Sequence, residues 1–218
     1  IKLLEEKRQA VISNAVKIGN SDKSSKLSYY VSLTSGFAFP SNDFSHNENH
    51  MRLLRGVNVS VGGIRWNDVV YWPTDRVAEV TDFSLSLDDI VFGMDRPWIS
   101  SGARVARIKK DDLPSLLVQR VARLRGRNGL TQSYLYAILS SNEFKSYIEA
   151  DLTGVSVPHI SPDQIKNFTF RVMPQEQQKH ITSELAHKLR KINKTRHKAK
   201  YSIDLLNERR TALISAAV

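Results

Sequence analysis

The sequence predicts an α+β fold, in which one domain of mixed strands, loops and short helices is followed by a long coiled-coil helix. Between residues 20 and 128, Gly, Ser, Asn and Asp separate short runs rich in Val, Ile, Phe, Trp and Tyr, which is typical of strands and turns. After Pro174 the chain contains neither Gly nor Pro, and apolar residues recur every three or four positions, which predicts a helix. We therefore divide the chain into residues 1–19, 20–170 and 171–218.

The first segment is predicted to be helical and is repeated at the end of the chain. Residues 1–16 and 203–218 are identical at ten of sixteen positions, with a constant offset of 202. We expect the chain to be one full repeat of a longer two-repeat protein, with residues 1–19 being the end of a preceding helix. The first copy has a seam with three- and four-residue steps, which is the spacing of a coiled coil. This seam comprises Ile1, Leu4, Arg8, Val11 and Ala15.

Within residues 20–170 the pattern predicts short strands first and short helices later. Residues 116–125 are predicted to form one buried strand, and residues 131–141 a helix capped by Thr131. A second short helix is expected over residues 142–150, and a turn at Gly154. Ser161 and Gln164 form the sequence signature of a capping box, with Pro at the first helical position.

The C-terminal helix is predicted to cover ~43 residues, which corresponds to ~65 Å. Such a helix cannot bury its apolar stripe on a small domain, so we expect another long helix beside it. A homodimer through this helix is one arrangement that would cover the stripe. The predicted seam consists of Leu185, Leu189, Ile192, Ala199, Ile203, Leu206 and Leu213.

Composition and charge narrow the classes of protein. Hydrophobic residues make up 41% of the 218 residues and charged residues 25%, which excludes a mostly disordered chain. The absence of Cys excludes disulfides, thiolate zinc sites and cysteine nucleophiles. No apolar run approaches the ~20 residues of a membrane span and no signal pattern is present, so we expect a cytoplasmic protein without membrane contact.

The net charge of +10 favours a polyanionic partner, and the excess lies mainly near the C-terminus. Residues 171–218 hold eleven basic and four acidic residues, and residues 187–200 hold seven Lys or Arg and no acid. Three interpretations stay open for this stretch: a solvated helix face, a contact with DNA phosphates, or a docking face for an acidic protein.

Motifs for catalysis are absent from the sequence. No phosphate-binding loop is present, and the pair Asp88 and Asp89 has no nearby Lys, so a turn or cap is the favoured interpretation. His180 and His187 share a helical face but are expected to be exposed and free of metal. We therefore expect neither an enzyme nor a bound cofactor or metal.

Side chains suited to reading DNA are frequent in the predicted loops. Arg can donate two hydrogen bonds to guanine, and Asn can pair with adenine. Trp66 and Trp98 are expected to belong to the core rather than to contact bases. The candidate DNA-binding residues are Arg52, Arg55, Asn58, Arg65, Asn67, Arg96, Arg125, Arg127 and Asn128.

Several stretches together resemble the specificity subunit of type I restriction–modification enzymes. They are SGFAFPSNDF (35–44), LLRGVNVSVGGIRW (53–66), LDDIVFGMDRPWI (87–99), GVSVPHIS (154–161), PQEQQKHI (174–181) and the ending ERRTALISAAV (208–218). The resemblance implies that residues 20–170 are a target-recognition domain that reads one half of a split DNA target. It also implies that residues 1–19 end a central conserved helix and that residues 171–218 form the distal one, packed antiparallel. The first recognition domain of the family is missing from this chain.

The implied partners are double-stranded DNA, the modification (methyltransferase) subunits and, through these, the restriction subunit. Methylation and cleavage would reside in those subunits, and the long helix would fix the spacing between two recognition domains. The alternative, from a different class, is a coiled-coil protein-interaction adaptor without sequence-specific DNA binding. Salt-dependent binding to duplex DNA separates the two, because release of counterions weakens DNA binding steeply as salt rises.

Overall fold

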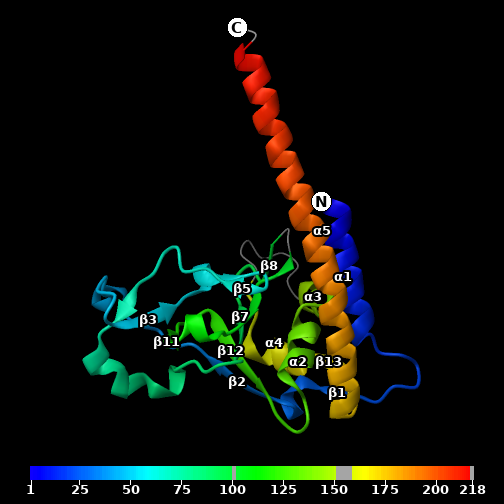
Figure 1. The fold of residues 1–218 in the computed structure, drawn as a ribbon. Helices are drawn as coiled ribbons and strands as arrows, with labels where there is room; N and C mark the ends of the chain where they lie inside the picture. Colours follow the sequence, from blue (N-terminus) through cyan, green and yellow to red (C-terminus); the bar gives the residue numbers. More distant parts are fainter. Residues whose placement is uncertain (100–101, 151–158, 217–218) are drawn as a thin grey trace.

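The computed structural model describes residues 1–99, 102–150 and 159–216, and it shows a domain beside the lower half of one long helix (Figure 1). The two longest helices, α1 and α5, lie side by side, and α2 lies between them and the central sheet, with α3 beside α1 and α2 and with α4 against β2. The helices are α1 (Lys2–Val16), α2 (Gln132–Leu139), α3 (Asn142–Ala150), α4 (Pro162–Asn167) and α5 (Gln175–Ala216). Short 3-10 segments are η1 (Leu27–Tyr29), η2 (Ser41–Asp43), η3 (Gly56–Asn58), η4 (Thr74–Phe83) and η5 (Lys110–Asp112).

Among the described residues, the strands form two main sheets and three isolated pairs. The central antiparallel sheet has the order β10 (Val105–Arg107), β7 (Ile90–Gly93), β12 (Val121–Gly126), β2 (Val31–Ser35). A second sheet, far from α5 in Figure 1, has the order β11 (Ser115–Leu117), β3 (Met51–Leu54), β6 (Tyr71–Trp72), with β11 and β3 parallel. The pairs are β1 (Ser24–Lys26) with β13 (Thr169–Arg171), β4 (Val59–Ser60) with β5 (Gly63–Ile64), and β8 (Trp98–Ile99) with β9 (Gly102–Ala103).

The single strand predicted over residues 116–125 is wrong, because the chain turns at Arg120. This residue has a φ of +68°, and the turn separates β11 from β12, which belong to different sheets. Gln119 and Arg120 interrupt the apolar run only briefly, so the sequence was interpreted as one strand across the turn. The apolar residues of both strands are nonetheless buried, as predicted, whereas Arg123 and Arg125 of β12 are half-buried.

The predicted helices of the domain are confirmed together with their caps. The Oγ1 of Thr131 accepts a hydrogen bond from the N–H of Tyr134 at 3.3 Å. Ser161 and Gln164 form the reciprocal capping box at the start of α4. The turn expected at Gly154 lies outside the described residues.

The helices α1 and α5 pack antiparallel and belong to the main core. Ile12 and Val16 of α1 are buried in the same cluster as Leu185 of α5. Nearer the other end of α1, Glu5 forms an ion pair with Arg196 of α5. The direction expected from the resemblance is therefore confirmed, and the partner helix beside the first half of α5 is the short α1 of the same chain.

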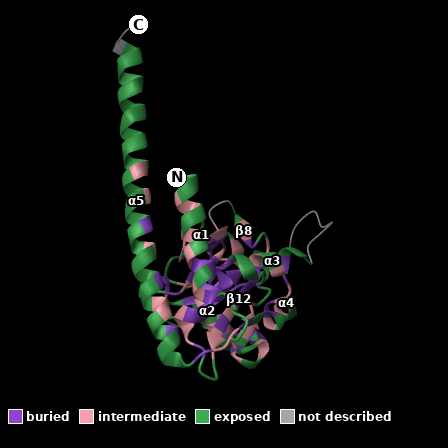
Figure 2. Ribbon diagram, turned by 90° about the vertical axis from the view of Figure 1, so that its right-hand side faces the viewer, coloured by how far each residue is buried: buried purple, intermediate pink, exposed green. Residues whose placement is uncertain are grey.

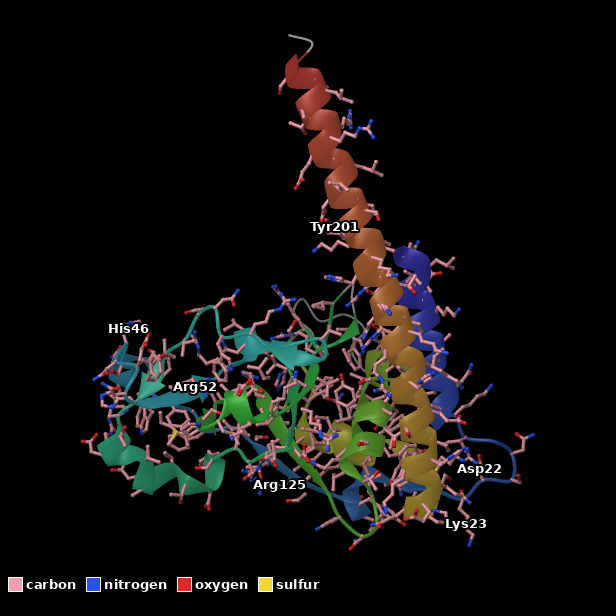
Figure 3. All side chains as sticks on the ribbon, in the orientation of Figure 1. Asp22, Lys23, His46, Arg52, Arg125 and Tyr201 are labelled. Atoms are coloured by element: carbon pink, nitrogen blue, oxygen red, sulfur yellow. The ribbon has the colours of Figure 1, made fainter. Side chains whose placement is uncertain are left out.

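Beyond Arg196 the long helix leaves the domain, and residues 201–215 are all exposed (Figure 2). We call these residues the overhang. Tyr201 marks its start, just past the N-terminus of α1 (Figure 3). Along the predicted seam, Leu185 and Ile192 are buried, Leu189 and Ala199 are half-buried, and Ile203, Leu206 and Leu213 are exposed. No helix in the described part of the chain is both long and apolar enough to cross a membrane.

Candidate nucleic-acid interface

Of the candidate DNA-binding residues, Arg96 lies at one end of the central sheet and Arg125, Arg127 and Asn128 lie at the other, whereas the rest lie on β3 or on the loop over residues 55–68. The upper edge is the end of the central sheet that carries the loop after β7 and the loops before β10 and β12. The end with the loops before β7 and after β12 is the lower edge, where Arg125 is labelled in Figure 3. Because neighbouring strands are antiparallel, residues distant in the sequence meet at each edge.

The loop over residues 55–68 is organised around the side chain of Asn58, which is only 1% exposed. Its Nδ2 donates to the carbonyls of Arg65 and Asp68 at 3.0 and 3.2 Å, and its Oδ1 accepts from the N–H of Arg55. Arg55 in turn forms an ion pair with Asp68 at 3.0 Å. These amide groups are satisfied inside the protein, so Asn58 shapes the loop and is not positioned to read a base.

Arg104 fastens this loop to the loop that follows β7. Its Nε donates to the carbonyl of Val59 at 3.1 Å, its Nη1 to that of Asp95 at 2.8 Å, and its Nη2 to that of Gly56. Burial lowers the pKa of Arg104, with repulsion from Arg96 adding to the effect and the carboxylate of Asp95 opposing it. The two loops therefore form one assembly held by a partly desolvated cation.

Arg65, Asn67 and Arg96 are exposed on this assembly. Within the described residues, none of their side chains forms a hydrogen bond or an ion pair. Arg96 also has a φ of +42°, in the region that residues with a Cβ rarely adopt. These two joined loops thus present uncommitted donors on segments that are themselves fixed: Arg96 on the loop after β7, and Arg65 and Asn67 on the loop over residues 55–68.

The candidates at the lower edge are more committed. Arg125 donates from Nε and Nη2 to the two carboxylate oxygens of Asp89, at 2.5 and 2.8 Å, and this hydrogen bonding raises the pKa of Arg125. Arg127 donates to the carbonyl of Ser28 at 2.8 Å, and Asn128 to that of Tyr29 at 2.6 Å.

Asp88 and Asp89 are structural, as their place before a strand predicted. The Oδ2 of Asp89 accepts from the N–H of Ser86 at 2.8 Å, and Asp88 forms an ion pair with Arg107. In the described ranges, no three His, Cys, Asp or Glu side chains gather in a way that could hold a metal.

Arg52 and the two tryptophans are tied into the protein. The guanidinium of Arg52 lies 4.7 Å from the ring centroid of Trp66 and donates to the carbonyl of Leu113 at 2.7 Å. The Nε1 of Trp66 donates to the carboxylate of Asp112 at 3.0 Å. Trp66 and Trp98 both pack against buried clusters, so their expected assignment to the core is confirmed.

Sequence reasoning missed four residues that organise these edges: Arg104, Arg120, His159 and Gln178. In the sequence, Arg104 resembles an exposed residue of an alternating strand. Its role could not be predicted because its carbonyl partners are up to 48 residues away. Gln178 lies in a run of polar helix residues but is 3% exposed. Only the quoted stretches PQEQQKHI and GVSVPHIS drew attention to the neighbourhoods of Gln178 and His159.

Comparison with curated proteins identifies specificity subunits of type I restriction enzymes as relatives, whereas no family model matches the chain. The EcoAI specificity subunit of Escherichia coli is 34% identical over 194 residues, which cover 88% of this chain and 32% of that protein. The MjaVIII specificity subunit of Methanocaldococcus jannaschii is 29% identical over 73% of this chain and 37% of its own length. The chain therefore spans about a third of the length of these relatives.

Solved structures show the same fold at low sequence identity. The HsdS subunit of Thermoanaerobacter tengcongensis matches 88% of this chain and 44% of its own, with a TM-score of 0.61 and 17% identity. A chain from a structure of the type I R-M system, solved to explain complex assembly and conformational transition, matches 94% of this chain and 49% of its own. Its TM-score is 0.70, at 16% identity. The mixed fold with a long C-terminal helix is thus confirmed by independent structures.

Proposed function

We propose that this chain, a relative of part of the type I restriction enzyme specificity subunits, is a DNA sequence-specificity module. It reads one half of a bipartite target through the domain of residues 20–170. Its long helix fixes spacing and docks the modification subunits, which bring the restriction subunit. The chain performs no chemistry itself. The sequence relationship over 88% of the chain favours this function over that of a protein-interaction adaptor.

The observation that carries the proposal is the state of the donors on the two loops that Arg104 joins. A base is read by side-chain donors and acceptors that are free and held in register, and phosphate attraction alone carries no sequence information. Arg65, Asn67 and Arg96 are exposed and uncommitted, and the loops that bear them are joined by Arg104. We therefore place base reading on these two joined loops.

The other candidates take supporting parts in this proposal. Arg55 and Asn58 stabilise the loop over residues 55–68, and Arg52 packs on the ring of Trp66 in the same loop. Arg125, Arg127 and Asn128 already donate to the protein at the lower edge, so they would have to exchange those bonds to meet DNA. The basic stretch of residues 187–200 is assigned to an acidic face of a modification subunit.

Titration of duplex DNA at increasing salt tests the function. We expect the chain, together with its modification subunits, to bind duplex DNA with a logarithmic affinity that falls linearly with the logarithm of salt concentration. The slope reports the number of phosphates neutralised, at about 0.9 per phosphate. Binding of the modification subunits without any binding to DNA would instead support the adaptor.

A further inference from the structure

The upper edge carries a second outward-facing arginine whose backbone conformation is costly. Arg120 has a φ of +68°, which glycine and asparagine adopt far more readily than arginine. A residue with a long side chain in this conformation persists only where the surroundings enforce it, and such residues cluster at functional sites. The position would be better filled by Gly if only the turn mattered, so the side chain itself requires an explanation.

Backbone hydrogen bonds fix the turn on both sides of Arg120. Its carbonyl accepts from the N–H of Met94 at 2.9 Å. The N–H of Gln119 donates to Phe37 at 2.8 Å, and that of Gly36 to Val121 at 2.9 Å. A Cβ on Gly36 would lie 2.1 Å from the carbonyl oxygen of Val118, so the two segments are in closest approach there. The Cα of Arg120 is therefore held in place by both neighbouring strands.

The side chain of Arg120 is exposed and is held by His159. Its Nη1 lies 3.2 and 3.1 Å from Nδ1 and Nε2 of the imidazole, and nearly equal distances to both place it over the ring face. The Nδ1 of His159 lies 2.7 Å from the Oδ1 of Asp95, which fixes the ring. Nε and Nη2 of Arg120 make no hydrogen bond to any residue that the structure describes.

The neighbourhood is cationic and continuous with the reading loops. Arg96 directly follows Asp95, the residue that orients His159, and Arg104 donates to the carbonyl of the same Asp95. Asp95 therefore links these cations: its backbone carbonyl accepts from Arg104, and its carboxylate orients the His159 ring that contacts Arg120. A planar guanidinium with two free donor positions on a fixed turn suits a phosphate oxygen pair.

We propose that Arg120 contacts a backbone phosphate of the DNA and that His159 is its positioning residue. This contact sets the register in which Arg65, Asn67 and Arg96 meet the base edges, because phosphate contacts position a protein on the duplex. The inference rests on the proposed function and adds a contact that reads no base.

Arg120→Gly tests the inference, because glycine relieves the left-handed backbone and removes only the side chain. Affinity of the chain with its modification subunits should fall about eightfold at 0.1 M salt, equally for all duplex sequences, and the salt slope should decrease by about 0.9. The melting temperature should not fall. Arg120→Asn, which also tolerates this φ, should behave alike, and Arg120→Lys should keep the salt slope.

Two further variants separate positioning from charge. His159→Phe retains a ring face under the guanidinium and should keep most of the affinity, whereas His159→Ala should weaken binding with the salt slope preserved. Lys179→Ala, which removes an exposed charge at the start of α5, is the matched control and should leave the affinity unchanged.

The outcomes distinguish the two proposals. Duplex binding that is unchanged in affinity and salt slope by Arg120→Gly and Arg120→Asn would overturn the phosphate contact and leave the proposed function standing. A change of preference at one base position would also overturn it, because Arg120 would then read sequence. Absence of duplex binding by the unchanged chain with its modification subunits would overturn the function and the contact together.

Discussion

At the scale of single residues, arginines of this domain fall into two groups with different environments. Arg104 donates hydrogen bonds to backbone carbonyls, and Arg125 donates to a carboxylate of the same chain. Arg65 and Arg96 are exposed, and their guanidinium groups donate no hydrogen bond to any residue that the structure describes. The two groups differ because a buried acceptor without a hydrogen bond lowers the stability of the fold, whereas an exposed donor can bond to water. Function is assigned to the second group for this reason.

The ion pair of Arg125 and Asp89 should contribute to stability rather than to base reading. Asp89 has a side chain that is 3% exposed, and Arg125→Ala would leave its carboxylate with little but the N–H of Ser86. We expect a loss of about 2 kcal/mol in the free energy of unfolding, measured by urea titration. Arg127→Ala, at an exposed site on the same edge, should change it by less than about 0.5 kcal/mol. Equal effects of the two variants would contradict this account.

The residue scale also shows how far the sequence could predict the site. Arg65, Asn67 and Arg96 could be predicted as exposed donors because donors in polar loops are visible in the sequence, and their contact with DNA stays a prediction. Asn58 looked identical to them, yet it is buried, because burial of a polar side chain depends on carbonyls that other segments supply. Arg120 was missed because a positive φ at a non-glycine residue leaves no mark in the pattern.

At the scale of elements, helix periodicity and caps predicted the helices well, and the strands less well. Thr131 and Ser161 cap their helices as expected, since capping is a local interaction over three residues. The turn at Arg120 divides one predicted strand between two sheets, and this depends on pairing with β2, β3 and β7, which lie far away in sequence. Tertiary pairing thus overrode a nearly continuous apolar pattern.

The joint between α5 and the domain depends on Gln178. Its Oε1 accepts from the N–H and the Oγ1 of Thr131, and its Nε2 donates to the carbonyls of Gly129 and Met173, all at 2.9 Å. The buried amide thereby ties the first turn of the long helix to the cap of α2. Gln178 thus adds a polar connection between the domain and α5 to the apolar packing of Leu185.

Gln178→Ala should lower the free energy of unfolding by about 2–3 kcal/mol, because several buried backbone groups lose their partner at once. The exposed neighbour Gln177→Ala is the matched control and should stay within about 0.5 kcal/mol of the unchanged chain. Chemical denaturation of both variants measures the difference. A cost of Gln178→Ala no larger than that of its neighbour would show that the joint is held by apolar packing instead.

At the scale of the whole molecule, the overhang raises the question of what covers its apolar residues. Leu206 and Leu213 are 64% and 63% exposed, and the segment from Ile203 to Val218 repeats the sequence of Ile1 to Val16, which packs on the domain. A second copy of the chain would supply equivalent surfaces and complete a symmetric pair of recognition domains. The overhang of one copy would then compete with α1 of the other for the same surface of the domain, or displace it.

Self-association should therefore depend on the seam of the overhang. We expect a concentration-dependent mass above that of one chain in light scattering, and its loss when Leu206→Glu and Leu213→Glu are combined. Tyr201→Glu, equally exposed but outside the seam, should leave the mass unchanged. A mass of one chain at all concentrations would reject the homodimer and leave the overhang for the modification subunits.

The central claim, that this chain reads DNA sequence, is tested most directly by selecting duplexes from a random pool with the chain and its modification subunits. The account predicts enrichment of one short, continuous half-site. Arg96→Ala should relax the preference at a single position, at a cost of about 1–3 kcal/mol, while Arg127→Ala leaves the selected sequence unchanged. Bound duplexes without any enriched sequence, or a selected half-site that Arg65→Ala and Arg96→Ala both leave intact, would contradict the account.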